Sequence, residues 1–251
     1  MLNIKTSGNG YPIVFLHGAL VDHSMWDNQK TLLEKQYKVI LVDLPNHGLS
    51  SDLEQEFTIE NVADAIIKVV IDKLDYCLIC GHSLGGMVCQ YIAISRPQIV
   101  KGIILAETSF GTKNNLSEKI QSALAEFFLL MVNSRTIINA SINQYGKLSK
   151  TTREYIKTEM GKYNIKQIRK VMSAALNYEG RKNLNSIKCK ALILVSEKNK
   201  QTHNQANIMN NEIPNSDLII ITQSHHLLNL DNENEFNEKL YKFISLTTAS
   251  T

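Results

Sequence analysis

One pentapeptide, Gly81-His82-Ser83-Leu84-Gly85, decides the fold of this chain. It follows the apolar run 76–80 and precedes 84–95, where apolar residues recur at helical spacing up to Arg96-Pro97. Proline at that point would end a helix. A serine on a tight strand-to-helix turn must accept a strained backbone, and flanking glycines let neighbouring chain pass without a Cβ clash. The pattern therefore predicts an exposed serine hydroxyl poised as a nucleophile.

The composition is that of an ordinary globular enzyme. The 251 residues are 43% hydrophobic and 20% charged, and the formal net charge of +3 is not gathered in a basic run, so we expect no nucleic-acid partner. The first residues lack the long apolar core of a secretory signal, and no segment reaches the length of a membrane span. We therefore expect a cytoplasmic protein with no membrane partner.

Four cysteines stand at positions 77, 80, 89 and 189. Their spacing is not that of a secreted disulfide scaffold, so we expect free thiols. Cys77 and Cys80 are separated like a redox or metal pair, but they lie in a predicted strand, where residues three apart point to opposite faces. We therefore assign them to core packing.

Strand-like and helix-like segments alternate along the chain. Strands are predicted at 13–16, 39–42, 76–80, 100–106, 191–196 and 218–221, and helices at 22–36, 59–74, 84–95 and 233–244. Short apolar, β-branched runs joined by helices indicate parallel strands with right-handed crossovers. The fold class is therefore α/β, a doubly wound, mostly parallel sheet of about seven or eight strands.

A long interval without a convincing strand separates two of these strands. It runs from residue 111 to 185, has helical periodicity and includes the run 123–132, which is apolar enough to need burial. A structureless loop of that length is improbable in a compact domain. We expect residues 1–110 and 186–251 to form the core and 111–185 to form an inserted helical cap, or lid, over the carboxyl edge of the sheet. An independent helical domain is the alternative.

A serine nucleophile needs a base, a group that orients the base, and donors for the developing oxyanion. His225-His226 follows the last predicted strand and precedes the final helix, which places a base in reach of the turn. No third ligand stands at metal spacing nearby, so we expect no metal. For the oxyanion, the candidate donors are the N–H of Leu84 at a helix start and that of Ala19 in the glycine-bearing turn His17-Gly18-Ala19-Leu20. His17 itself is interpreted as a buried orienting histidine.

Taken together, these motifs resemble the α/β-hydrolase superfamily. The matching stretches are Phe15-Leu16-His17-Gly18, Trp26, the segment Asp43-Leu44-Pro45-Asn46-His47-Gly48-Leu49-Ser50, the 81–85 turn, and Ser224 to Leu230. On that resemblance His226 occupies the position of the catalytic histidine, and His225 stands where a small residue is usual. Asn46 replaces a common glycine, which asparagine can do because it tolerates left-handed backbone angles.

The acid of the resembled triad is where this sequence departs from the family. Ser196-Glu197-Lys198-Asn199 resembles the family's Gly-Glu-x-Asp and so places Asn199 where an aspartate would stand. An amide does not stabilise an imidazolium as a carboxylate does. Glu107, directly after the predicted strand 100–106, is our preferred acid, because some superfamily members resemble this arrangement. Asn199 as a neutral orienting group is the alternative, and Glu197 is a further candidate.

The resemblance implies a cofactor-independent serine hydrolase that forms an acyl-enzyme. Ser83 would attack a small, fairly apolar ester or lactone, as in carboxylesterases, with a small molecule as its partner. Carbon–carbon bond hydrolysis, thioester hydrolysis and aminopeptidase action remain alternatives within the fold, as does a ligand-binding or signalling protein with low turnover. The sequence leaves open whether the chain is a monomer or a homodimer.

Overall fold

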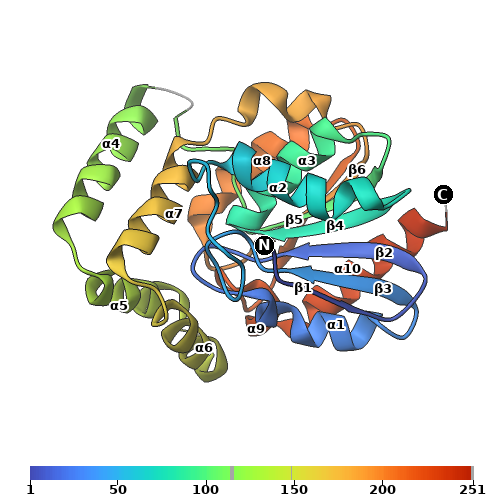
Figure 1. Ribbon diagram of the computed structural model, residues 1–251, viewed down its shortest axis with the longest axis horizontal. Coiled ribbons are helices and arrows are strands. Elements are labelled where there is room, and N and C mark those ends of the chain that lie inside the picture. The colour runs from blue at the N-terminus through green and yellow to red at the C-terminus, as the bar shows by residue number, and fades with distance from the viewer. Residues whose placement is uncertain (114–115, 148, 250–251) are drawn as a thin grey trace.

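The computed structural model describes residues 1–113, 116–147 and 149–249. They form a seven-stranded sheet in the order β1-β3-β2-β4-β5-β6-β7 (Figure 1). The strands are β1 (Ile4–Ser7), β2 (Tyr11–Leu16), β3 (Tyr37–Val42), β4 (Cys77–His82), β5 (Val100–Ala106), β6 (Lys190–Ser196) and β7 (Ser216–Ile221). All neighbours are parallel except β1, which runs antiparallel to β3 at the edge. The predicted fold class is confirmed.

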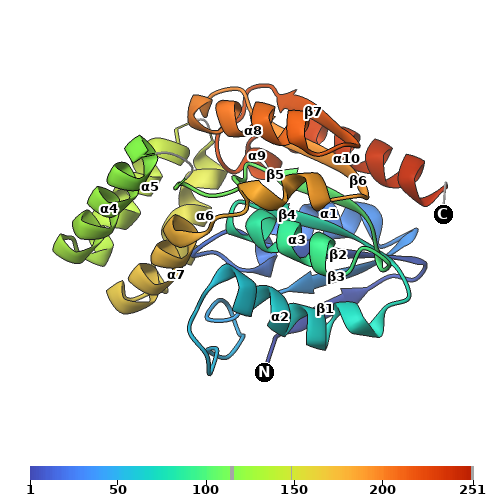
Figure 2. The ribbon, with the colours of Figure 1, turned by 90° about the horizontal axis from the view of Figure 1, so that it is seen from above.

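Helices cover both faces of this sheet and extend beyond one end of it (Figures 1 and 2). The α-helices are α1 (Asp27–Leu33), α2 (Ile59–Val69), α3 (Leu84–Ser95), α4 (Leu116–Met131), α5 (Ser134–Tyr145), α6 (Lys150–Met160), α7 (Ile165–Asn177), α8 (Lys200–Glu212), α9 (Leu228–Asp231) and α10 (Glu233–Thr248). The 3-10 helices are η1 (His23–Trp26), η2 (Ile71–Lys73) and η3 (Arg181–Ser186). Across the described residues, none of these helices combines the length and apolarity needed to cross a membrane.

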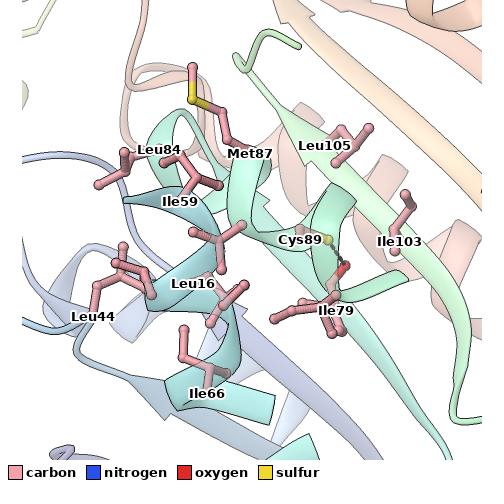
Figure 3. Close-up of a cluster of buried hydrophobic side chains, with 14 of the residues drawn as sticks. Leu16, Leu44, Ile59, Ile66, Ile79, Leu84, Met87, Cys89, Ile103 and Leu105 are labelled. Atoms are coloured by element: carbon pink, nitrogen blue, oxygen red, sulfur yellow. Dashed lines mark hydrogen bonds between the residues drawn. The ribbon is translucent and has the colours of Figure 1, made fainter. Parts of the chain in front are cut away.

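The core consists of two apolar layers, one on each face of the sheet. Alternate residues of a strand enter opposite layers, as the period of two requires: Ile13 packs with α1 and α10, and Val14 packs with α2 and α3. Figure 3 shows the second layer, where Leu16, Ile79 and Ile103 meet residues of α2 and α3. Cys77 and Cys80 fall in different layers, and all four cysteines are free. Cys77 and Cys80 therefore serve as core packing residues and do not form a disulfide.

Several elements depart from the sequence-based expectations. The edge strand β1 was not predicted because Ile-Lys-Thr-Ser has no apolar run and is only half-buried. Helix α8 was not predicted because its sequence is almost wholly polar, with Ala206 and Met209 as its buried residues. The segment 22–36 is shorter than expected, since Asp22 caps η1 and helix α1 ends at Leu33.

The interval between β5 and β6 is helical, as predicted, and holds α4 to α7 and η3. The expectation that the run 123–132 is buried was wrong. Leu124, Phe127 and Phe128 are 62%, 63% and 58% exposed, because α4 packs against α7 through its other face and lies at the outside of the molecule (Figures 1 and 2).

Asp43, which follows β3, forms hydrogen bonds with several loops at the amino-terminal part of the sheet. Its buried carboxylate accepts hydrogen bonds from the backbone N–H groups of His23 and Leu49 and from the side chain of Asn3, and it pairs with His23 Nδ1 at 2.7 Å. Burial alone would raise the pKa of Asp43, but these donors outweigh burial and hold the pKa below its ordinary value. Ionised Asp43 therefore stabilises the folded state.

We expect Asp43→Ala to lower the free energy of unfolding at pH 7 by about 3 kcal/mol, since it leaves several buried donors without an acceptor. The contribution of Asp43 is present above its unfolded-state pKa of about 4 and is lost as the pH falls through the lower folded-state pKa. The difference between wild type and variant should therefore shrink below about pH 4. Urea titrations across pH measure this, with exposed Asp52→Ala as the matched control; an equal loss from both variants would contradict the assignment.

Candidate active site

Ser83 sits on a strained turn between β4 and α3. Its backbone has φ +50° and ψ −113°, angles that a non-glycine residue adopts only when its surroundings impose them. The surroundings are fixed by two hydrogen bonds: Ser83 N–H donates to the Ala106 carbonyl at 2.9 Å, and Thr108 Oγ1 donates to the Ser83 carbonyl at 2.6 Å. The predicted strand-to-helix turn is therefore held from the neighbouring strand β5.

The two glycines of the pentapeptide are required by close backbone contacts. A Cβ on Gly81 would lie 2.3 Å from the Gly85 carbonyl oxygen, and a Cβ on Gly85 would lie 2.4 Å from the Leu16 carbonyl oxygen. Neither distance is physically possible without movement of the backbone. The turn is thus packed against the end of β2, from which the loop His17–Leu20 begins.

His226 and Glu107 are brought together although they lie 119 residues apart in the chain. His226 lies in the loop between β7 and α9, and Glu107 follows the last residue of β5. His226 Nδ1 is 3.3 Å from Glu107 Oε2. Glu107, like Ser83, has a positive φ, +47°, so the end of β5 is strained at the residue that faces the histidine. The sequence analysis named both residues, and the fold places them in contact.

Asn199 contacts Glu107 and not the histidine. Its side-chain N–H donates to Glu107 Oε2 at 2.7 Å, and Thr202 Oγ1 lies 3.3 Å from both carboxylate oxygens. The backbone N–H of Ser196 donates to Glu107 Oε1. Glu197 lies away from this group and accepts from Gln223 N–H. The loop after β6 thus supplies donors to an acid that comes from β5.

These contacts set the ionisation of Glu107. Burial alone would raise the pKa of its carboxyl group, which is 1% exposed. The hydrogen bond and the electrostatic interaction with His226, with the donors from Ser196 and Asn199, outweigh burial and hold the pKa of Glu107 below its ordinary value. Glu107 is therefore ionised at neutral pH and able to stabilise an imidazolium on His226.

The loop that carries His226 is held by its neighbours. His82 Nε2 donates to the His226 carbonyl at 2.7 Å, and burial together with the nearby His226 lowers the pKa of His82 to about 3, so His82 stays neutral. The adjacent His225 receives the His226 N–H on Nδ1 at 2.9 Å, and its own N–H donates to Asp231 Oδ2 at 2.9 Å. His225 therefore orders the loop backbone.

The two segments that carry the predicted oxyanion donors, Leu84 and Ala19, lie beside Ser83. Leu84 is the first residue of α3, where a helix leaves its N–H without an intrahelical acceptor. The turn with Ala19 approaches from β2: a Cβ on Gly18 would lie 3.5 Å from Ser83 Cβ. His17 is fully buried, accepts from Leu44 N–H at 2.9 Å on Nε2 and contacts the Gly18 carbonyl at 2.7 Å through Nδ1. His17 orients this turn, as the sequence analysis interpreted it.

A cavity of about 220 Å³ opens over Ser83 and His226. Its walls come from the His17–Val21 turn and from helices α5, α6 and α7, and the residues that line it are Gly18, Ala19, Leu20, Val21, His82, Ser83, Ile137, Ser141, Tyr145, Ile156, Met160, Met172, His226 and Leu227. Apart from its histidines, the lining carries no ionisable group except the Tyr145 phenol, so the described walls offer no fixed charge to a ligand.

Tyr145 is the residue at this site that the sequence analysis missed. Its ring stacks on the His226 ring with centroids 4.6 Å apart and an interplanar angle of 28°. Burial raises the pKa of the Tyr145 phenol above its ordinary value, and the nearby Glu107 charge raises it further. Tyr145 ends α5, a helix whose sequence carries no catalytic motif, so only the packing of the inserted helices identifies it. Thr108, which follows β5, and Thr202, in α8, were also missed, because only the tertiary structure brings them to Ser83 and Glu107.

Comparison with known proteins assigns most of the chain to one family. The model of the alpha/beta hydrolase fold matches residues 11–233. The (E)-2-((N-methylformamido)methylene)succinate hydrolase of Acinetobacter baylyi is 22% identical over 246 residues, which are 96% of this chain and 92% of that protein. The pimeloyl-[acyl-carrier protein] methyl ester esterase of Nitrosomonas europaea is 32% identical over 109 residues, but the match spans 43% of this chain and 41% of the esterase. The chain thus matches less than half of that esterase's length.

Solved structures show the same fold over nearly the full length. MenH from S. aureus superposes with a TM-score of 0.86 at 24% identity and covers 98% of each chain. A thermophilic esterase from Thermogutta terrifontis superposes with a TM-score of 0.86 at 19% identity, covering 98% of this chain and 93% of the other. At these identities the likeness concerns the fold alone.

Proposed function

The chain belongs to the alpha/beta hydrolase fold family, and from that premise we propose that it is a cofactor-independent serine hydrolase that cleaves a small ester or lactone through an acyl-enzyme. The observation that carries the proposal is the grouping of Ser83, His226 and Glu107 at one cavity. The strained Ser83 and His226 line the same cavity, and Nδ1 of His226 faces the ionised, buried carboxylate of Glu107. That arrangement activates a hydroxyl toward an acyl carbon.

Acylation begins when Ser83 Oγ attacks the carbonyl carbon of the substrate. Nε2 of His226 takes the hydroxyl proton, and Glu107 stabilises the imidazolium through Nδ1. The N–H groups of Leu84 and Ala19 donate to the oxyanion. Collapse of this intermediate expels the alcohol oxygen, which receives the proton from His226. Water then attacks the acyl-enzyme by the same route, and the carboxylic acid leaves with Ser83 restored.

Asn199 is a positioning residue in this proposal. In the resembled family an aspartate after β6 would contact the histidine. Here Asn199 stands at that position and donates to the carboxylate of Glu107, which contacts the histidine in place of the aspartate. An asparagine suits this place because its amide N–H holds Glu107 Oε2 without adding a second negative charge. An aspartate beside buried Glu107 would force the two carboxyl groups to share a proton.

The cavity favours an uncharged substrate. A water molecule occupies about 30 Å³ in the liquid, so 220 Å³ holds roughly seven water-sized groups. A carboxylate placed among these walls would lose its hydration without gaining a cationic partner. We propose that helices α4 to α7 act as the cap that sets this selectivity, since Ile137, Met160 and Met172 from three of them line the space.

We further propose that the protein works in the cytoplasm. All four cysteines are free, and three of them are buried, which suits a reducing compartment such as the cytoplasm. The expected partner at the active site is a small molecule.

We expect a fluorophosphonate probe to label the folded protein on Ser83, because only an activated serine attacks phosphorus at a useful rate. Intact mass spectrometry and peptide mapping locate the adduct. Ser83→Ala should abolish labelling and lower esterase turnover by about a million-fold, whereas the control Ser141→Ala, in the same cavity, should still be labelled. If the probe did not label the wild-type protein, the hydrolase proposal would be wrong, and a ligand-binding role would be the remaining alternative.

Glu107→Gln should lower kcat about a thousandfold or more, since the amide does not stabilise imidazolium. Asn199→Ala removes one donor and should cost about tenfold. Asn199→Asp removes the same donor and places a second carboxyl group against buried Glu107, so the two carboxyl groups share a proton and kcat should fall by about tenfold or more.

Steady-state kinetics from pH 5 to about pH 9 measure all three variants, and circular dichroism verifies that each is folded. Glu197→Gln is the matched control, because Glu197 lies outside the site. Glu107 would lose its assigned role if Glu107→Gln kept wild-type turnover while Asn199→Ala lost it.

Two p-nitrophenyl esters of equal chain length test the substrate class. The butyrate should be cleaved with a kcat/KM about a hundredfold above that of the hemisuccinate, which differs by one terminal carboxylate, because desolvation of an unpaired charge costs several kcal/mol. Both esters are followed by release of nitrophenolate, and their rates of hydrolysis in buffer give the control. Equal values for the two esters would contradict an uncharged pocket.

A further inference from the structure

Helix α4 carries apolar side chains on its outer face. Ile120, Leu124, Phe127 and Met131 recur at spacings of four, three and four residues, so they share one face of the helix. Their exposed fractions are 54%, 62%, 63% and 73%. Phe128 and Leu130, on the flanks, are 58% and 63% exposed. We call these six residues the α4 stripe. An exposed apolar patch on a globular protein marks an interaction site.

The opposite face of α4 is the polar one, and it faces inward. Ser122 is buried and lies 2.8 Å from Thr112 Oγ1. Glu126, half-buried, accepts from the side chain of Asn177 in α7. The helix is therefore inverted relative to an ordinary surface helix, whose apolar face enters the core.

Hydrogen bonds at its end fix this orientation. Arg169 of α7 donates to the carbonyls of Leu129, Leu130 and Val132, at 2.8, 2.8 and 3.2 Å. These carbonyls belong to the last turn of α4 and the residue after it, which a helix leaves without intrahelical partners. The stripe is thus held outward. Figures 1 and 2 both place α4 at the outside of the molecule, and in Figure 1 α7 lies between α4 and the core.

Charge is divided unevenly between the inserted helices and the core. Residues 111–185 contain 13 Lys and Arg against 5 Asp and Glu, whereas the remaining residues contain 14 against 19. The overall charge of +3 conceals this asymmetry. Exposed basic residues lie on α4 and on two helices next to it: Lys119 on α4, Arg135 at the start of α5, which follows α4 in the chain, and Lys166 at the start of α7, which packs on α4. The occupant of the stripe must therefore combine an apolar surface with negative charge.

We infer that α4 docks on an anionic lipid surface, with the stripe inserted between the headgroups and the exposed basic residues on the lipid phosphates. Apolar burial combined with basic residues is the way interfacial helices bind such surfaces. A second copy of the chain fits less well, because an interface through α4 brings two strongly basic segments together. The expectation of no membrane partner rested on the lack of a spanning segment, which peripheral docking does not need.

Cosedimentation with vesicles tests the inference. Wild-type protein should bind vesicles of phosphatidylcholine with a third phosphatidylglycerol, and bind pure phosphatidylcholine vesicles far more weakly. An increase in salt from about 0.05 to about 0.5 M should weaken the binding, since it screens the charges. Leu124→Gln/Phe127→Gln should lower the partition coefficient at least about tenfold, because it removes two of the large apolar side chains that would enter the lipid.

The matched control is Leu32→Gln/Leu246→Gln, which changes two exposed leucines on α1 and α10 (40% and 60% exposed) and should bind as wild type. Ser83→Ala should also bind as wild type, so the result does not depend on the proposed hydrolase activity. Two outcomes overturn the inference: no binding of wild type to anionic vesicles, or equal binding by both double variants. A concentration-dependent dimer in analytical ultracentrifugation, abolished by Leu124→Gln/Phe127→Gln, would assign the stripe to a second copy instead.

Discussion

The carboxylate of Glu107 forms hydrogen bonds with residues from other segments of the proposed site. It stands at the end of β5, receives donors from the loop after β6 and faces His226 in the loop after β7. Three neighbouring strands thus deliver their carboxyl ends to one buried charge. A buried carboxylate without donors would take up a proton, so the donors from Ser196 and Asn199 are what keep Glu107 ionised. The orientation of His226 follows from that charge.

Strain at two strand ends accompanies this arrangement. Ser83 and Glu107 both have positive φ angles, and the two residues are linked because Ser83 N–H donates to the carbonyl of Ala106, the neighbour of Glu107. Strained backbone persists where the surrounding structure over-determines it. Here the surrounding structure is the parallel pairing of β4 with β5 and of β5 with β6, whose registers leave both residues one step beyond the sheet. The pairing of these strands therefore maintains the positive φ angles of both the proposed nucleophile and the proposed acid.

The inserted helices connect the site with the outer surface. Tyr145 of α5 stacks on His226, and Thr152 of α6 donates to Asp231, whose other carboxylate oxygen holds the loop of His225. Two helices of the insertion thus contact the loop that carries the proposed base. Helix α4 packs on α7 and presents its apolar stripe outward. Within one insertion, some helices shape the cavity and another faces away from the core.

The sequence by itself determined six of the seven strands, the serine turn and Ser83, because local spacing fixes which residues follow a strand and which begin a helix. The resemblance to the family added His226 and Glu107 as candidates. The sequence did not determine the acid's partners. Asn199 stood where the resembled family keeps a carboxylate, and only the packing of β5 beside β6 shows that it donates to Glu107. Tyr145 and the outward stripe of α4 were equally hidden, since apolar residues at helical spacing predict a buried face without stating which neighbour buries it. Contacts between segments far apart in the chain depend on tertiary packing, and the tertiary structure alone decided them.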